Sequence, residues 1–294
     1  MLEKITKSGT FLLLMLTFFI SCTAKLHAQS DTTEIWRIKT VDGNEFVGQI
    51  VRQTETELTI KTQRIGTFSL LLTDIKQMDQ VNKANIHGDE VWRQNRQESR
   101  YFVAPSAFGL KKGEGYYQNA WIVFNQLTYG VTDNFSIGAG TIPVFLFSGS
   151  STPVWVTPKF SIPVEKNSVT LGAGAFIGSV LGEDEEFGVV YGTSTFGSPE
   201  RNFTFGVGYG FVDGDFADSP AITMSGMIRA GKKAYLITEN YLISTDNDTY
   251  GIMSVGGRRL WNNVALDFGG IIPIGDVDDF IIIPWLGIVF SFGS

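Results

Sequence analysis

Short stretches in which large apolar residues alternate with small or polar ones recur from residue 100 to the end of the chain. In residues 203–211 the odd positions are large and apolar, and the even positions are Thr or Gly. Residues 169–175 and 135–140 follow the same two-residue period. Because successive side chains of a β-strand point to opposite faces, this pattern predicts strands with one apolar face and one small or polar face.

The arrangement of these stretches predicts a closed barrel. No apolar run in this region reaches the roughly eighteen residues that a membrane-spanning helix needs. We count twelve strand-like segments, the first at 101–108 and the second at 118–131. Tight connections such as residues 132–134 alternate with longer ones such as 182–186, and this alternation is typical of outer-membrane barrels. An even number of strands leaves both ends of the barrel on the same, periplasmic side.

The composition agrees with such a barrel. Charged residues make up 18% of the chain, against roughly 25% in an average soluble domain. The mean hydropathy is nevertheless only +0.07. Alternation explains both values, because apolar residues that face lipid are averaged with Gly, Ser and Thr that face inward. The net charge of −7 argues against a nucleic-acid partner, which binds basic surfaces.

The last strand-like segment ends in an alternating aromatic motif. Its residues Gly287, Phe290 and Phe292 resemble the terminal assembly signal of bacterial outer-membrane proteins, although two residues follow the final Phe. With this motif, residues 100–294 resemble the outer-membrane β-barrel proteins. The resemblance implies an all-β chain with a transmembrane antiparallel up-and-down β-barrel of about 12 strands. It also implies outer-membrane lipid and the barrel-assembly machinery as partners.

The N-terminus predicts export. Lys4 and Lys7 precede an apolar run at residues 11–20, which is too short to span a membrane as a helix. We predict a signal peptide over residues 1–28. The alternative is a lipoprotein cleavage site that leaves Cys22 lipidated. If Cys22, the single cysteine, is removed with the signal, the mature chain has no disulfide, no thiol nucleophile and no Cys metal site.

Residues 31–81 predict a small periplasmic β domain, because short alternating segments are separated by turn residues. The stretch 38–50 resembles the first motif of Sm-like small barrels, which implies a bent SH3/Sm-like sheet. The second motif of that family is not recognisable around Ile65, so RNA binding is not carried over. We interpret this domain as a spacer or as a docking domain for a periplasmic partner, and residues 82–99 as a polar linker.

Five charged positions inside the strand-like segments are candidates for lining the lumen. A charge that faces lipid at the middle of the membrane costs up to a few kcal/mol, so we expect these side chains to face inward. The candidates are Lys159, Arg229, Glu239, Arg258 and Asp267. Two interpretations stay open, because twelve strands lie between barrels filled by side chains and open porins. The charges either form a paired network that fills a narrow barrel or form a polar constriction that selects solutes.

Catalysis is not expected. His27 and His87 are the two histidines of the chain, and neither lies in residues 100–294. A barrel hydrolase that activates serine or water through histidine therefore has no base. The acidic segments 183–186 and 276–279 are interpreted as solvated rims, with weak Ca²⁺ binding as the alternative. We expect neither a metal site nor a cofactor.

The sequence therefore predicts an exported, non-enzymatic protein of the bacterial outer membrane, with residues 31–81 in the periplasm. The favoured function is a narrow channel or transporter for small solutes. The alternative is a structural anchor whose plugged barrel presents residues 31–81 to a periplasmic partner.

Overall fold

The computed structural model describes most of the chain as β-structure, in two compact units, Met1–Lys83 and Ala84–Ser294. The predicted signal peptide, with Cys22, lies outside the described residues, as does the acidic segment 276–279. Within the described part of the chain, no helix is long and apolar enough to cross a membrane. The structure describes residues 34–81, 86–87, 90–145, 151–244, 249–275 and 281–293.

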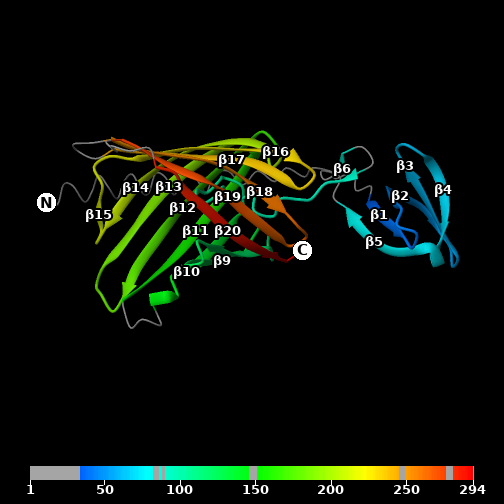
Figure 1. The fold of residues 1–294 in the computed structure, drawn as a ribbon, viewed down its shortest axis with the longest axis horizontal. Coiled ribbons are helices and arrows are strands. Elements are labelled where there is room, and N and C mark those ends of the chain that lie inside the picture. Colours follow the sequence, from blue (N-terminus) through cyan, green and yellow to red (C-terminus); the bar gives the residue numbers. More distant parts are fainter. Residues whose placement is uncertain are drawn as a thin grey trace. The chain divides into compact units, whose positions relative to one another are not determined.

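The first unit contains a five-stranded antiparallel sheet, drawn in blue and cyan in Figure 1. Its elements are β1 (Ile35–Thr40), β2 (Glu45–Gln53), β3 (Glu57–Thr62), β4 (Gly66–Leu71), the 3₁₀ turn η1 (Leu72–Asp74) and β5 (Ile75–Val81). The strands stand in the order β4-β3-β2-β1-β5. The pairing register shifts between Ile50 and Arg52 and between Lys39 and Thr40, and such irregularities bend a sheet and increase its twist. The small bent-sheet domain predicted from the sequence is therefore present.

The core of this unit comes from the alternation of β1 and β3. Ile38, Leu58 and Ile60 are fully buried and pack together. Gly48 lies where β2 meets β3, and a Cβ atom there would stand 2.3 Å from the carbonyl oxygen of Lys61. The absence of a side chain at Gly48 thus permits the close pairing of these two strands.

The second unit is a closed antiparallel barrel. Its strands are β8 (Gly115–Ala120), β9 (Phe124–Gly130), β10 (Phe135–Thr141), β11 (Thr152–Glu165), β12 (Val169–Leu181), β13 (Glu186–Ser198), β14 (Arg201–Val212), β16 (Ala221–Gly231), β17 (Ala234–Ser244), β18 (Thr249–Leu260), β19 (Val264–Ile274) and β20 (Ile283–Phe292). Strands adjacent in the sequence are paired, and β20 pairs with β8, so the sheet has no free edge. The predicted all-β fold with a twelve-stranded antiparallel barrel is confirmed.

Three two-residue strands accompany the barrel. Asp215–Phe216 (β15) pairs with the end of β14, whereas Ile86–His87 (β6) and Glu90–Val91 (β7) form a short hairpin before the barrel begins.

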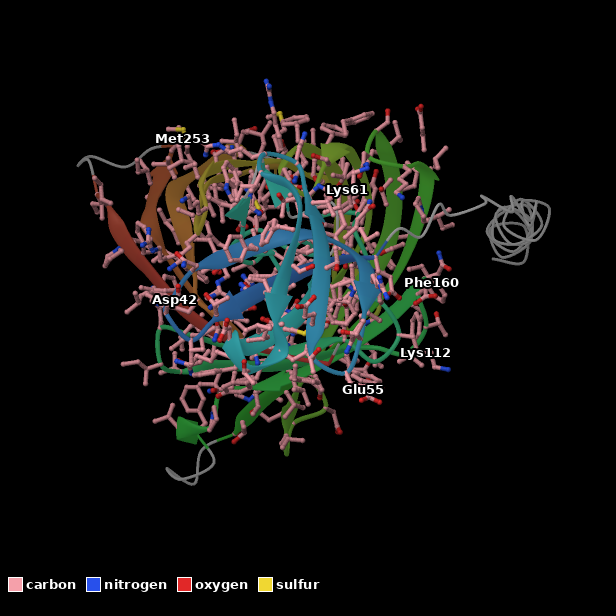
Figure 2. The ribbon with its side chains drawn as sticks, turned by 90° about the vertical axis from the view of Figure 1, so that its right-hand side faces the viewer. Asp42, Glu55, Lys61, Lys112, Phe160 and Met253 are labelled. Atoms are coloured by element: carbon pink, nitrogen blue, oxygen red, sulfur yellow. The ribbon has the colours of Figure 1, made fainter. Side chains whose placement is uncertain are left out.

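The two faces of the barrel differ in the way that the alternation predicts. On β14, Phe203 and Phe205 are exposed on the outer surface, while Thr204 between them is 1% exposed. Phe160 and Met253 also point outward, as Figure 2 shows. Each of the twelve strands exposes at least one large apolar side chain on the outside. Large apolar side chains are thus exposed around the whole barrel, whereas soluble monomers usually expose only small apolar patches.

The first two strands differ from those expected. Residues 101–108 do not form a barrel strand, and the segment predicted as one strand over 118–131 is divided between β8 and β9. The division lies at Trp121 and Ile122, whose φ angles of 48° and 69° turn the chain. These bulky residues give no turn signal in a sequence, because positive φ angles normally favour Gly or Asn. The count of twelve is thus right, although two of its members were wrongly placed.

The two ends of the barrel can be distinguished by the chain termini. Gly115 at the start of β8 pairs with Phe292 at the end of β20, so both lie at one end, here called the terminal end. The opposite end, here called the loop end, carries the connection at 121–123 and the longer one at 213–220. Connections at the terminal end are short, with only residues 232–233 between β16 and β17. The tight connection at 121–123 interrupts the predicted alternation of short and long connections.

Candidate functional site in the barrel lumen

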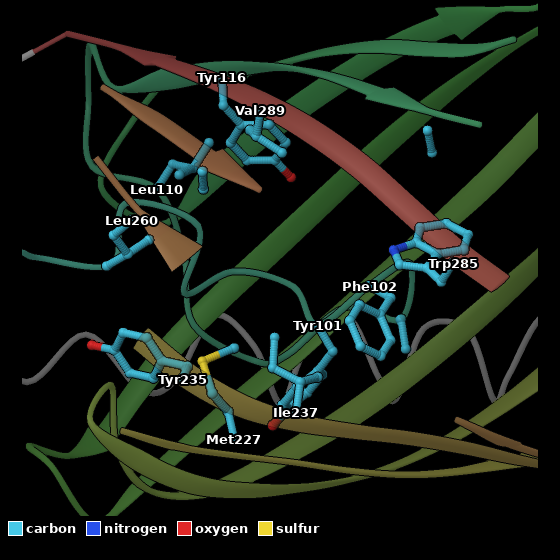
Figure 3. Packing of buried hydrophobic residues seen from close by; sticks show 13 residues of the cluster. Tyr101, Phe102, Leu110, Tyr116, Met227, Tyr235, Ile237, Leu260, Trp285 and Val289 are labelled. Carbon is cyan, nitrogen blue, oxygen red and sulfur yellow. The ribbon is translucent and has the colours of Figure 1, made fainter. Parts of the chain in front are cut away.

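Residues 93–110, here called the luminal segment, run inside the barrel before the first barrel strand begins. Tyr101, Phe102 and Leu110 are buried in one cluster with side chains of the barrel wall, as Figure 3 shows. The backbone of the segment is irregular apart from one isolated bridge between Arg100 and Pro105. Irregular backbone that is buried must find hydrogen-bond partners elsewhere, and here the barrel wall supplies many of them.

The location of this segment corrects two expectations from the sequence. Residues 93–99 belong to the barrel unit, although a polar linker was expected over residues 82–99. Residues 101–108 lie inside the barrel, although their alternation suggests a strand of the wall. The physical reason is the same for both, because polar groups of the segment bond to charged and hydroxyl groups on the inner face of the barrel.

Arg229 lies at the terminal end, near the end of β16. Its guanidinium donates to the carboxylate of Glu200 and, through Nη2, to the carbonyl of Arg93 at 2.8 Å. The guanidinium also stands 4.4 Å from the ring centroid of Tyr235, in a cation–π contact. Arg229 therefore contacts the beginning of the luminal segment and is separate from the other four candidates.

Arg258 and Asp267 form the centre of the buried charge network. They are directly opposite each other on β18 and β19, and both are fully buried. Arg258 donates to Asp267 through Nε at 2.6 Å and Nη2 at 3.0 Å, and to the carbonyls of Gln97 at 2.9 Å and Tyr101 at 2.6 Å. Arg100 donates to the same carboxylate at 2.9 Å. The wall thus holds the luminal segment through an ion pair and through backbone bonds at once.

Glu239 on β17 binds the backbone of the luminal segment. Its Oε2 accepts from the N–H groups of Phe102 at 2.7 Å, Val103 at 2.9 Å and Ala104 at 3.0 Å. Its Oε1 accepts from the hydroxyl of Tyr241 at 2.7 Å. Three successive N–H groups that converge on one carboxylate oxygen fix a sharp bend of the segment and satisfy a buried charge.

Lys159 on β11 binds the other side of the bend. Its ammonium donates to the carbonyls of Ser99 at 3.0 Å, Ser106 at 2.8 Å and Phe108 at 2.6 Å. A lysine has three donors, and all three are used here. Lys159 and Glu239 therefore bind complementary groups of the same segment, carbonyls in one case and N–H groups in the other.

Apolar contacts complete the attachment. Phe102 packs beside Trp285 with ring centroids 5.9 Å apart, and both are labelled in Figure 3. Tyr101 lies in the same cluster as Met227 and Ile237, and its hydroxyl bonds to Asn202 and Thr204 at 2.7 Å each.

Close backbone approach occurs where the segment passes β12. A Cβ atom at Gly172 would lie 3.0 Å from the Cα atom of Ala107. The neighbouring Thr195 on β13 accepts from the N–H of Ala107 at 2.7 Å. Glycine at position 172 therefore makes room for the luminal segment.

The structure thus brings four of the five candidates, Lys159, Glu239, Arg258 and Asp267, onto one partner, which is residues 95–108. Sequence reasoning missed that partner, including Arg100 and Gln97. One signal was available, because the face of β17 that carries Glu239 also carries the large apolar residues Tyr235 and Ile237. Large apolar side chains on an inner face indicate that something apolar fills the lumen beside them.

A cavity of about 620 Å³ lies next to the luminal segment, toward the loop end. Arg100, Ala104 and Lys159 border it on the side of the segment, and Trp121 and Trp285 border it nearer the loop end. The lumen is therefore divided into a part filled by the chain itself and a part that is hollow.

Comparison with known proteins gives similarity of fold at low identity. No protein-family model matches the chain, and no curated protein matches it. The KdgM porin superposes with a TM-score of 0.47 at 10% identity, over 61% of this chain and 99% of that chain. A loop-deletion mutant of OmpT, an outer membrane protein of Vibrio cholerae, gives 0.35 at 11% identity, over 88% and 97% of the two chains. With TM-scores below 0.5, these similarities do not bear on the function of this chain.

Proposed function

We propose that this chain is an outer-membrane β-barrel channel for small solutes whose lumen is closed by residues 93–110. The observation that carries the proposal is the way the segment is held. Arg258, Glu239 and Lys159 bind its backbone from three strands, and a hollow continues beyond it toward the loop end. A barrel with a hollow and an internal closure fits a conduit that opens when the closure moves.

The apolar outer belt supports the membrane location. Exposed aromatic and aliphatic side chains on all twelve strands match the surface that lipid requires, and the closed sheet leaves no unpaired edge. In this proposal the barrel-assembly machinery recognises the motif of Gly287, Phe290 and Phe292 on β20, and the terminal end of the barrel faces the periplasm. The five-stranded sheet of residues 34–81 is then a periplasmic domain, for which we retain an SH3/Sm-like docking role as a proposal.

The chemistry of the closure favours a movable element over a permanent filling. Buried ion pairs gain little net stability compared with well-packed apolar residues, because removing charges from water is costly. When the segment leaves, the charged groups become hydrated, so their exposure costs less free energy than the exposure of apolar groups would. In the open state the inner face would expose the charged groups of Lys159, Glu239 and Asp267 to water, together with apolar side chains such as Ile237. Residues 100–294 contain no histidine, and we propose no enzymatic role.

Solute permeation into liposomes tests this function. The purified full chain is compared with a variant in which residues 95–108 are replaced by a Gly-Ser linker of equal length. We expect liposomes with the variant to swell in isosmotic small sugars or amino acids at a rate at least about tenfold above the wild-type rate, since a twelve-stranded barrel is wide enough to hold water once its lumen is vacated. A control variant, Phe203→Leu on the outer face, should swell at the wild-type rate. Equal and negligible swelling of all three, with heat-modifiable gel mobility proving folded barrels, would contradict the channel.

A further inference from the structure

The hollow part of the lumen has the size of a small-molecule site. Its volume of about 620 Å³ falls within the roughly 300–1,000 Å³ that is usual for ligand pockets. It is bordered by the luminal segment on one side and by residues near the loop end on the other, including Trp121 in the β8–β9 turn and Trp285 at the start of β20.

A continuous arc of aromatic rings covers one wall of the cavity. Trp285 contacts Trp121 at a centroid distance of 5.0 Å, and Trp121 contacts Phe124 at 6.1 Å. The arc continues from Phe124 to Trp155 at 6.5 Å and from Trp155 to Phe176 at 5.8 Å. All five residues border the cavity. A barrel wall that faces only water would not need this apolar surface, which is suited to a ligand with an apolar or aromatic body.

The side of the cavity formed by the luminal segment is positive. Among the described residues that border the cavity, the charged ones are Arg100 and Lys159. The acidic partners Asp267 and Glu239 do not border it, and neither does Glu98 on the luminal segment. Lys159 donates to three neutral carbonyls. Arg100 is ion-paired with Asp267 through Nη1, and its Nε and Nη2 are buried and have no hydrogen-bond partner among the described residues. In a low-dielectric lumen these cations attract an anionic group.

The remaining wall offers hydrogen bonds without charge. Thr157, Thr193 and Thr223 border the cavity from three strands, and Gln118 and Gln126 add amide groups. Few polar groups that converge on a largely apolar pocket orient a ligand and set its specificity. The arrangement therefore suits a ligand with one charged or polar head group and a larger apolar body.

We propose that the cavity binds a small amphipathic anion, with a carboxylate or sulfonate near Arg100 and Lys159 and an apolar body along the aromatic arc. This inference deepens the proposed function and rests on it for the role of the bound ligand as a solute of the channel. It assigns the class of solute that the lumen selects.

Three probes with the same body and different heads test the proposal on the wild-type full chain in lipid nanodiscs. Phenylbutyrate carries an anionic head, phenylbutanol a neutral head and phenylbutylamine a cationic head. In calorimetric titrations we expect phenylbutyrate to bind at least about tenfold more tightly than phenylbutanol, and phenylbutylamine not to bind, because the two charged side chains that border the cavity are both cations. Equal affinity for the three probes, or no binding of phenylbutyrate, would overturn the proposal.

Variants locate the binding within the lumen. Phe176→Leu removes a ring of the arc, and we expect at least about fivefold weaker phenylbutyrate binding, whereas Phe205→Leu on the outer face should bind like wild type. Arg100→Gln should reduce the difference in affinity between phenylbutyrate and phenylbutanol several-fold, since Lys159 remains at the cavity and Arg258 still neutralises Asp267. A Phe205→Leu variant that loses as much as Phe176→Leu would show adsorption at the outer surface and would contradict the site. Binding needs no open channel, so failed titrations and failed liposome swelling are separate results.

Discussion

Asp267 is the residue on which the charge network depends, because it is the carboxylate shared by Arg100 and Arg258. Asp267→Asn leaves two buried guanidinium groups without a counter-ion, and removing one partner from a buried ion pair typically costs about 3–5 kcal/mol. We expect the luminal segment to open more often in this variant, which hydrogen exchange at residues 99–108 measures as lost protection. Asp218→Asn, at an exposed position near the loop end, should leave that protection unchanged. Unaltered exchange in Asp267→Asn would show that the ion pair does not hold the segment.

Asp79 links the stability of the N-terminal unit to pH. Arg37 lies opposite it on β1 and donates at 2.7 Å, and this bond holds the pKa of the Asp79 carboxyl below its ordinary value. The folded unit therefore binds this proton less readily than the unfolded chain does. The stabilisation is present above the ordinary carboxyl pKa and is lost as the pH falls through the lowered value.

Urea titrations that follow a fluorinated tryptophan at position 36 measure this dependence. We expect the free energy of unfolding of the unit to fall by up to about 1 kcal/mol between about pH 6 and about pH 3 through this pair, given its partial exposure. Asp79→Asn should show a correspondingly smaller fall, and Asp74→Asn should retain the wild-type dependence. A wild-type dependence in Asp79→Asn would assign the effect to other carboxyl groups.

At the scale of elements, the contact between β12 and the luminal segment can be tested by size. Gly172→Val places methyl groups where Ala107 already lies, so the segment must shift away from the wall. We expect protection from hydrogen exchange to fall across residues 105–109 by about tenfold or more. Gly192→Val on β13 is the matched control, because a Cβ atom there meets nothing within 4 Å. Equal exchange in the two variants would contradict the observed path of the segment.

The sequence predicts the strands far better than it predicts the turns and the filling of the lumen. Alternation identifies β14 and β20 directly, because a two-residue period with aromatic residues has one structural solution in lipid. The sequence does not predict the turn at Trp121 and Ile122, because these residues have no turn preference and the turn conformation depends on tertiary contacts. Residues 101–108 alternate as a strand does, and periodicity says which residues share a face but does not say what lies opposite them.

The site was predictable in part for a related reason. The cost of a charge in lipid indicates that Asp267 and Lys159 avoid the outer face, and the structure places both side chains in buried positions. Their partners could not be inferred, because backbone carbonyls and N–H groups of an irregular segment leave no pattern in a sequence. The aromatic arc could not be predicted, because Trp121, Trp155 and Trp285 lie far apart in the sequence and only the fold brings them together.

At the scale of the whole molecule, the barrel sheet is closed on itself, and in the proposed function the barrel's own chain closes the lumen. Closure of the sheet follows from pairing of β20 with β8, which removes the edges that lipid cannot satisfy. In the proposed function, residues 93–110 close the lumen. The first closure is permanent, and the second is the one that a channel must reverse.

Single-channel recording in planar bilayers tests whether residues 93–110 close the barrel lumen. We expect the wild-type full chain to conduct rarely or not at all. Replacing residues 95–108 with a Gly-Ser linker of equal length should give stable openings with a mean current at least about tenfold higher, as expected for a water-filled barrel of this strand number. Equal conductance of the two proteins, with both shown to be folded by heat-modifiable mobility, would contradict it.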